Sequence, residues 1–221
     1  MKNPHETYWM IRLEKCRNAL EKNNFEAYSV GNLKDAERFI LEKLIPGLNP
    51  KTVSWGGSQT IGLSDIFDHL KSNPQIQYVT TFEGGGSHDE KWERCQQALL
   101  VDLYLSSTNA VTETGILVNL DMWGNRVGAI TFGPKNVIIL AGRNKIASDL
   151  EDAMSRVKRI AAPMNAIRHS HKKGRDTPCS KKGECFDCVH PMRICNVWSI
   201  SEKSFPANRI KVVLINEDLG Y

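Results

Sequence analysis

The sequence lacks any apolar stretch long enough to cross a membrane. A spanning helix needs a run of about 18 or more apolar residues, and none occurs among the 221 residues of the chain. The first ten residues, MKNPHETYWM, also lack the apolar core of a signal peptide. From these two absences we expect a cytoplasmic protein with no membrane association.

The common nucleotide-binding signatures are missing as well. Two glycine-rich segments occur, SWGGSQT at 54–60 and EGGGSHDE at 83–90. Neither has the glycine spacing of a dinucleotide fingerprint or the lysine of a P-loop. The sequence therefore indicates neither NAD nor ATP as a ligand.

Excess charge is scarce and confined to one place. The net charge is +4, and the segment 168–184 holds six of the 29 basic residues but only two of the 25 acidic ones, so the remaining 23 and 23 balance. Nucleic-acid binding normally needs a broad basic face. We therefore expect no nucleic-acid partner.

What the chain does contain is a regular alternation of helix and strand patterns in an ordinary globular composition, 41% apolar and 24% charged. Asn3 and Pro4 are typical of the start of a first helix. Strand patterns follow at 25–30, 52–56 and 76–82, and helix patterns at 33–45, 60–72 and 89–105. This alternation predicts an α/β fold, a mostly parallel sheet with helices on both faces.

The alternation of helix and strand patterns stops after residue 108, where strand-like segments follow one another with short turns between them. We expect neighbouring strands, some antiparallel, at NAVTE, GILVNLD, RVGAITF and NVIILAG. Ser148 and Glu151 predict the start of a helix that ends near Pro163. Strands at 194–200 and 209–215 close the chain. We predict a single domain, 1–221, with a cysteine-rich loop at about 168–196.

The segment SWGGSQT lies where a strand leads into a helix. Gly56 and Gly57 would let backbone amides approach a ligand, and Ser58 and Thr60 would add hydroxyl groups. An anion suits such a turn. The alternative is a tight connection in which Ser58 only caps the helix.

A second polar stretch, TETGILVNLDMWGNRVGAITFGP, occupies 112–134. Glu113 sits at a strand end where its carboxylate could project into a crevice, and Asn119 interrupts an apolar strand. Asn125 and Arg126 follow at a turn, from which the guanidinium could reach an anionic ligand. Ordinary turn chemistry and a surface ion pair would explain the same residues.

Four of the six cysteines fall within 17 residues, with the spacing C-x5-C-x2-C-x6-C. Only one CxxC knuckle is present, whereas a zinc ribbon usually has two. Iron–sulfur ligation accepts a close pair with two flanking thiolates, and disulfides are disfavoured in a reducing cytoplasm. An iron–sulfur cluster, structural zinc and unligated thiols all stay open, with His169, His171 and His190 as substitute ligands. The proposed ligands are Cys179, Cys185, Cys188 and Cys195.

Three segments together resemble a known family, the LUD domain of lactate-utilisation protein C and its relatives. They are SWGGSQT, the run VTETGILVNLDMWGNRVGAITFGPKNVIILAGRNKI and the ending INEDLGY. The resemblance covers essentially the whole chain. The segment PCSKKGECFDCVHPMRIC further resembles a stand-alone subgroup that carries a four-cysteine cluster.

The resemblance implies a fold similar to ribose-5-phosphate isomerase and the CoA transferases, with a ligand crevice built from glycine-rich loops. CoA transferases of this fold use a glutamate nucleophile, a role that would pass to Glu113. Family members take part in lactate oxidation alongside partners that hold iron–sulfur clusters. One expectation from the resemblance is therefore an enzyme within an oxidoreductase system for lactate or a related hydroxy acid. The resemblance does not decide whether this chain is itself catalytic.

The leading hypothesis is a redox-associated, lactate-utilisation-type protein that binds a small anionic metabolite. Its cofactor would be an iron–sulfur cluster, with zinc as the alternative, and its partners iron–sulfur redox proteins. The second hypothesis is a non-redox isomerase or acyl/CoA-transferase-type enzyme with Glu113 as base or nucleophile and structural zinc. A non-catalytic binding subunit remains a third. The amphipathic first helix could serve a homodimer as readily as a core.

Overall fold

The computed structural model describes residues 3–81, 83 and 85–221 of the chain. Its main sheet has six strands in the order β1-β10-β7-β4-β2-β3, and every neighbouring pair is parallel. The strands are β1 (Glu26–Val30), β2 (Thr52–Trp55), β3 (Gln77–Tyr78), β4 (Leu103–Ser107), β7 (Asn136–Gly142) and β10 (Ile210–Ile215). The predicted α/β fold is confirmed, although Phe82, the last residue of the third predicted strand, lies outside the described residues.

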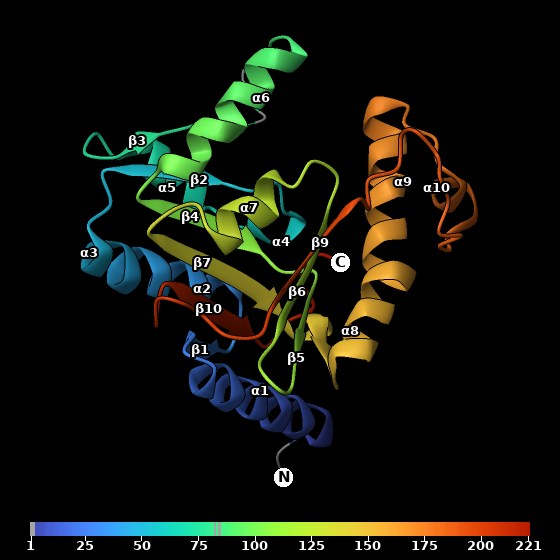
Figure 1. Cartoon of the computed structure of the whole chain (residues 1–221). Coiled ribbons are helices and arrows are strands. Elements are labelled where there is room, and N and C mark those ends of the chain that lie inside the picture. The colour runs from blue at the N-terminus through green and yellow to red at the C-terminus, as the bar shows by residue number, and fades with distance from the viewer. Residues whose placement is uncertain (1–2, 82, 84) are drawn as a thin grey trace.

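Helices pack on both faces of this sheet (Figure 1). On one face, α1 (Pro4–Lys22) and α7 (Asn125–Thr131) contribute to one apolar core. The opposite core is built with α2 (Leu33–Phe39), the π-helical turn η1 (Ile40–Leu44), α3 (Ile45–Leu48), α4 (Gln59–Gly62) and α5 (Ile66–Ser72). Burial of both sheet faces explains why the strands read as nearly continuous apolar runs.

A second, four-stranded sheet has the order β8-β5-β6-β9. It consists of β5 (Ala110–Thr112), β6 (Leu117–Asp121), β8 (Ile146–Ala147) and β9 (Val197–Ser201). The β5–β6 and β6–β9 pairs are antiparallel, and β5–β8 is parallel. Antiparallel neighbours are thus confirmed in this part of the chain.

A long helical rod runs beside the second sheet on the right of Figure 1. Its parts are α8 (Leu150–Arg156), the π-helical turn η4 (Val157–Ala161) and α9 (Ala162–Lys173), followed by the short α10 (Pro178–Lys182). Pro163 was expected to end this helix, but the rod continues through it: Pro163 is the second residue of α9, directly after the π-helical turn η4. The predicted cysteine-rich loop therefore begins with helix rather than coil.

Two further predictions of secondary structure were wrong. RVGAITF was expected to be a strand but forms α7, because the Asp121 carboxylate accepts a hydrogen bond from the Val127 amide at the start of the helix. The helix expected over 89–105 ends earlier, since α6 (His88–Gln97) gives way to the 3-10 turn η2 (Ala98–Leu100) before β4 begins. An apolar run such as that in β4 fits either structure until its neighbours are known.

Candidate functional site

The glycine loop lies at the carboxyl end of β2 and packs tightly against its surroundings. A Cβ atom added to Gly56 would lie 2.6 Å from the Tyr104 hydroxyl oxygen and 2.8 Å from Cγ of Arg126. The Gly56 amide already donates to the Leu105 carbonyl oxygen at 3.0 Å. Only glycine fits this close approach, which explains the residue without invoking a ligand.

Gly57 and Ser58 complete the turn. Gly57 is exposed, and the Ser58 hydroxyl accepts a hydrogen bond from the Ile61 amide at 3.3 Å. Ser58 is therefore the N-cap of α4, as the alternative interpretation of this segment held. Anion binding by these two residues stays a prediction.

The Arg126 side chain is buried and bonds to several internal groups, so it is not a surface cation. It forms an ion pair of 2.7 Å with Asp121 and donates to Oδ1 of Asn119 at 2.6 Å and to the carbonyl oxygen of Ser107 at 2.9 Å. It begins α7 together with the half-buried Asn125. The sequence placed this residue at a turn and indicated no such set of internal partners.

Asn119 leaves one polar atom without a partner. Its Oδ1 accepts from Arg126, but Nδ2 is buried and has no hydrogen-bond partner in the part of the chain that the structure describes. An unsatisfied buried donor normally costs about 1–3 kcal/mol. Such an atom is an expected feature of a site whose ligand completes the hydrogen bonding.

Lys145 joins the same region from the end of β7. Its Nζ atom donates to Oγ1 of Thr60 and to Oγ of Ser107, each at 2.7 Å. The side chain is buried, at 3% exposure. The pKa of Lys145 lies well below its ordinary value. Burial is the main cause, and the positive charges of Arg156 and Arg126 lower the pKa further.

These contacts define what we term the carboxyl-edge cluster. Ser107 ends β4, Thr60 and Lys145 lie on the segments that follow β2 and β7, and Asn119 and Arg126 reach the cluster from β6 and α7. In open α/β sheets ligands bind outside this edge. Of the predicted ligand residues, the structure brings Thr60, Asn119 and Arg126 into one hydrogen-bonded network, with Gly56 against it. The members are Thr60, Ser107, Asn119, Arg126 and Lys145.

The C-terminal tail, residues 216–221, lies over this cluster. The Thr60 hydroxyl donates to the Leu219 carbonyl oxygen at 3.1 Å. The Asn144 side chain accepts from the Leu219 amide at 3.0 Å and donates to the Gly220 carbonyl oxygen at 3.1 Å. The ending INEDLGY thus closes the edge of the sheet next to Lys145.

Glu113 has a different set of neighbours. Its carboxylate pairs with Arg12 and Lys15 of α1, each at 2.5 Å, and its amide donates to the Ala147 carbonyl oxygen. Burial alone would raise the pKa of Glu113, but hydrogen bonds from Lys15 and Arg12 and their charges outweigh it, so the net pKa lies below its ordinary value. A carboxylate held in this way is a weak base.

The four clustered cysteines line one small cavity. Its volume is about 10 Å³, roughly the space of one water molecule. The thiol groups are not drawn into a coordination shell: among the described residues, no group of three or more His, Cys, Asp or Glu side chains is placed to hold a metal ion. The cavity is lined by Ala162, Pro163, Thr177, Cys179, Cys185, Phe186, Cys188, Arg193, Ile194 and Cys195.

Two cations border the thiols. Arg193 donates to the carbonyl oxygens of Cys188 and Cys195, and its buried Nε has no hydrogen-bond partner within the described residues. Burial would lower the pKa of Lys158, but its bond to Asp187 and the charges of Cys185 and Cys195 raise it overall. Positive charge therefore accumulates where thiolates would carry negative charge.

Of the three candidate histidine ligands, His190 accepts the Met192 amide at its Nδ1 atom, and His169 and His171 lie on α9. None of them lines the thiol cavity.

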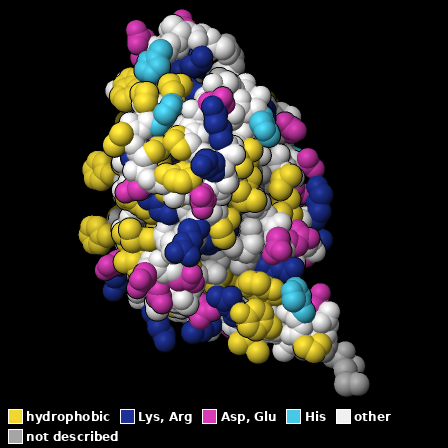
Figure 2. All heavy atoms as spheres, turned by 90° about the vertical axis from the view of Figure 1, so that its right-hand side faces the viewer, with side chains coloured by type: hydrophobic (Ala, Val, Ile, Leu, Met, Phe, Trp, Pro, Cys, Tyr) yellow, Lys and Arg dark blue, Asp and Glu magenta, His cyan; other side chains and the backbone are white. Residues whose placement is uncertain are grey.

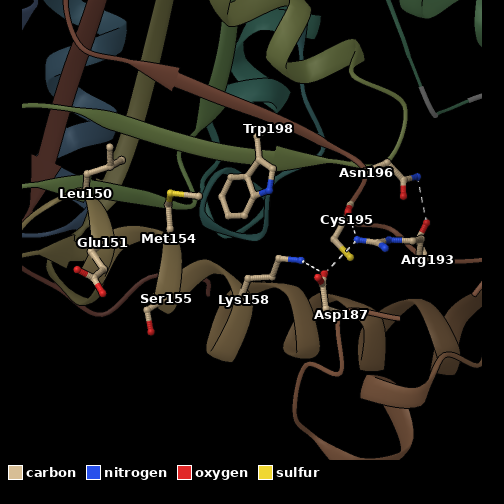
Figure 3. A pocket seen from close by; sticks show the side chains of 10 residues that line it. All are labelled: Leu150, Glu151, Met154, Ser155, Lys158, Asp187, Arg193, Cys195, Asn196 and Trp198. Atoms are coloured by element: carbon tan, nitrogen blue, oxygen red, sulfur yellow. Dashed lines mark hydrogen bonds and ion pairs between the residues drawn. The ribbon is translucent and has the colours of Figure 1, made fainter. Parts of the chain in front are cut away.

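An open groove of about 860 Å³ adjoins the thiol cavity, and Cys195 lines both (Figure 3). Trp198 and Met154 point into the groove from β9 and α8 (Figure 3). At its end, Asp187 lies 2.7 Å from Lys158 and 3.7 Å from Arg193. The groove therefore connects one thiol to solvent past a bridged pair of cations.

Comparison with known proteins places the chain. A family model described as the LUD domain matches residues 13–215. The chain belongs to the LUD domain family. This membership assigns it to the lactate-utilisation-type proteins and confirms the family inferred from its motifs. No curated protein matches it in sequence.

A solved LUD-like structure supports the same fold. It is a DUF162 family protein from Deinococcus radiodurans, 12% identical, with a TM-score of 0.52 over 94% of this chain and 98% of that chain. At this level of identity the likeness shows the fold alone. Within the described part of this LUD domain, no helix is long and apolar enough to cross a membrane.

Sequence reasoning missed Lys145, a lysine whose side chain is buried. It stands in a polar turn, RNK, within the 3-10 turn η3 (Arg143–Lys145), and nothing local distinguishes it from a surface lysine. Its burial depends on Thr60 and Ser107, which are distant in sequence. Asn109 and Arg156, which also contact this region, gave no sequence signal either.

Proposed function

We propose that this LUD-domain protein is redox-associated, holding a metal centre on its four clustered cysteines and binding a small anionic metabolite at the carboxyl-edge cluster. One observation carries the proposal: Cys179, Cys185, Cys188 and Cys195 line a single cavity. Membership of a stand-alone subgroup with a cysteine cluster is part of this proposal.

The four cysteines are suitable ligands for a metal that prefers thiolate sulfur. Four cysteine sulfurs would carry a large negative charge, and Arg193 and Lys158 lie where they offset it. We favour an iron–sulfur cluster, with zinc as the alternative, held by the four cysteines after the segment closes on it. An iron–sulfur centre would supply single-electron transfer.

The metal segment also offers a route to a partner. Cys195 lines the open groove, so a second protein could approach this edge of the site without passing through the core. The face toward α9 and α10 shows hydrophobic side chains mixed with histidines and with charged side chains of both signs (Figure 2). We propose iron–sulfur redox proteins as partners there, in keeping with the role of the family.

Excess positive charge supports an anion at the carboxyl-edge cluster. Arg156 donates to the backbone oxygens of Asn144 and Asn109 and forms no ion pair within the described residues. Burial lowers the pKa of Arg156 to about 10, with the charge of Asp152 opposing it. An entering carboxylate would balance that charge and could accept from the unsatisfied Nδ2 of Asn119.

The non-redox alternative receives less support. It requires Glu113 to act as base or nucleophile, yet both carboxylate oxygens are paired with Arg12 and Lys15. Charge pairing of this kind stabilises the carboxylate and weakens it as a base. Catalysis by Glu113 remains a prediction with its own test below.

Anaerobic purification tests the metal proposal. The visible spectrum, iron, acid-labile sulfide and zinc contents of the full chain are measured together. We expect a coloured protein with iron and sulfide in matching amounts. A colourless protein that contains zinc alone would reject the redox version and retain a structural metal, whereas neither metal would reject the site.

A further inference from the structure

Lys145 differs from Lys211, which is also deeply buried. Lys211 lies 3.4 Å from the carboxylate of Glu26 and also donates to Asn136 and to the Asn208 carbonyl oxygen. Lys145 has only hydroxyl partners, Thr60 and Ser107, and no carboxylate lies within ion-pair distance of it among the described residues. A buried ammonium without a counter-charge is costly, so this amine is favoured in its neutral form.

The hydrogen-bond directions show where the amine's lone pair is. The Thr60 hydroxyl donates onward to the Leu219 carbonyl oxygen at 3.1 Å, and the Ser107 hydroxyl to the Thr108 carbonyl oxygen at 3.2 Å. Both hydroxyls must therefore accept from Lys145. A neutral amine has two N–H groups, which these bonds use, and its lone pair is left for a carbon electrophile.

We propose that Lys145 is a nucleophile that forms an imine with a small oxo acid, a carboxylate that bears a carbonyl group. This inference rests on the proposed function, because the substrate's carboxylate would occupy the anion site beside Arg126, Arg156 and Asn119. The contacts around Lys145 offer both halves of the recognition: the unpaired charge of Arg156 and the amide of Asn119 for the carboxylate, and a neutral amine for the carbonyl.

The chemical step needs no oxidant or reductant. The lone pair of Nζ forms a C–N bond while the carbonyl π electrons move to oxygen, which takes a proton from the amine. The resulting carbinolamine loses that oxygen as water with the remaining amine proton, and a C=N bond forms. The hydroxyls of Thr60 and Ser107 lie at 2.7 Å from Nζ, where they can relay these protons.

The C-terminal tail is one cover of the cluster that could move. The tail contacts the cluster through Leu219 and Gly220, by way of hydrogen bonds with Thr60 and Asn144. The tail follows β10 and belongs to neither sheet, so its displacement would leave the strand pairing intact. Displacement of the tail is therefore the entry route that the proposal requires.

Reductive trapping tests the proposal on the wild-type full chain. The protein is incubated near neutral pH with glyoxylate, the smallest oxo acid, and cyanoborohydride, and adducts are located by peptide mass mapping. Each unit by which a lysine pKa falls raises its neutral fraction about tenfold. We expect at least about tenfold more adduct on Lys145 than on Lys211 or on exposed lysines.

Binding is measured in parallel by calorimetry with glyoxylate and with glycolate, which has a hydroxyl in place of the carbonyl. Binding of both with an adduct on Lys145 supports the inference. Binding without an adduct there, or adducts spread evenly over surface lysines, overturns it and leaves the anion site standing. No binding of either compound overturns both. Lys145→Met should lose the adduct and Lys211→Met should keep it.

Discussion

The Nζ atom of Lys145 lies 2.7 Å from the Oγ1 atom of Thr60, a residue 85 positions away in the chain, and both side chains are buried. The bond joins the end of β7 to the start of α4 across the carboxyl edge of the sheet. Because Thr60 also holds Leu219, one hydroxyl connects the amine to the C-terminal tail.

Replacing Thr60 by valine should therefore destabilise the protein. The substitution preserves shape but leaves an N–H of Lys145 and the Leu219 carbonyl oxygen without their partner, at a cost of about 1–3 kcal/mol. Urea unfolding measures the change. Thr131→Val is the control, since its exposed hydroxyl bonds only to its own helix, and should stay within about 0.5 kcal/mol. Equal effects would contradict a special role for Thr60.

Gly220→Ala should loosen the tail. Gly220 has a φ of 63°, and an added Cβ would lie 2.7 Å from Oγ1 of Thr60. Hydrogen exchange of the tail amides should accelerate, and trapping at Lys145 should rise. Gly174→Ala provides a matched control, because Gly174 has a similar φ of 59° with nothing within 4 Å of the added atom. Faster exchange of the tail in the control as well would remove the clash as the cause.

Asn119→Asp should weaken binding of an anionic metabolite. The change replaces the unsatisfied amide donor by a carboxylate oxygen, which repels an anion; hydrogen bonds to charged groups contribute about 1.5–3 kcal/mol, so affinity should fall at least about tenfold. Calorimetry with glycolate provides the measurement. Asn136→Asp adds the same charge at the amino end of β7, away from the cluster, and should bind normally. A similar loss in both variants would point to net charge alone.

Glu113→Gln should lower stability at neutral pH without changing the fold. The folded pKa of Glu113 lies below its unfolded value, so the carboxylate stabilises the protein above the unfolded pKa, and this contribution is lost as the pH falls through the folded pKa. We expect a loss of about 0.5–1 kcal/mol near pH 7 that disappears in acid. Thermal unfolding against pH tests it, with the exposed Glu93→Gln as control.

The same variant decides the catalytic hypothesis for Glu113. Complete loss of turnover in a folded Glu113→Gln protein would support the hypothesis of a non-redox isomerase or acyl-transferase. Unchanged turnover would confine Glu113 to its ion pairs with α1.

Cys185→Ser should remove the metal and its colour from protein purified without oxygen. Serine is a poor ligand for iron or zinc at a thiolate site. Metal analysis and the visible spectrum provide the readout. Cys16→Ser is the control: Cys16 is buried in the core, where burial and the charge of Glu113 raise the pKa of its thiol to about 12. Full metal content in Cys185→Ser would argue against the four-cysteine set.

The sequence by itself determined the features that depend on local pattern. Alternating periodicities predicted the parallel sheet, and the Gly56 turn marked the carboxyl end of a strand. The clustering of four cysteines was equally visible, because close sequence spacing limits how far apart they can lie. Local signals of this kind survive folding because neighbours in the chain stay neighbours in space.

Only the tertiary structure decided what the polar residues contact. Arg126 and Lys145 look like surface cations in the sequence, yet one is enclosed by Asp121 and Asn119 and the other by Thr60 and Ser107. Glu113 was predicted to project into a crevice, and only the structure shows that its carboxylate pairs with Arg12 and Lys15 of α1. Burial and charge balance depend on which distant segments meet at a sheet edge, and no local periodicity encodes that meeting.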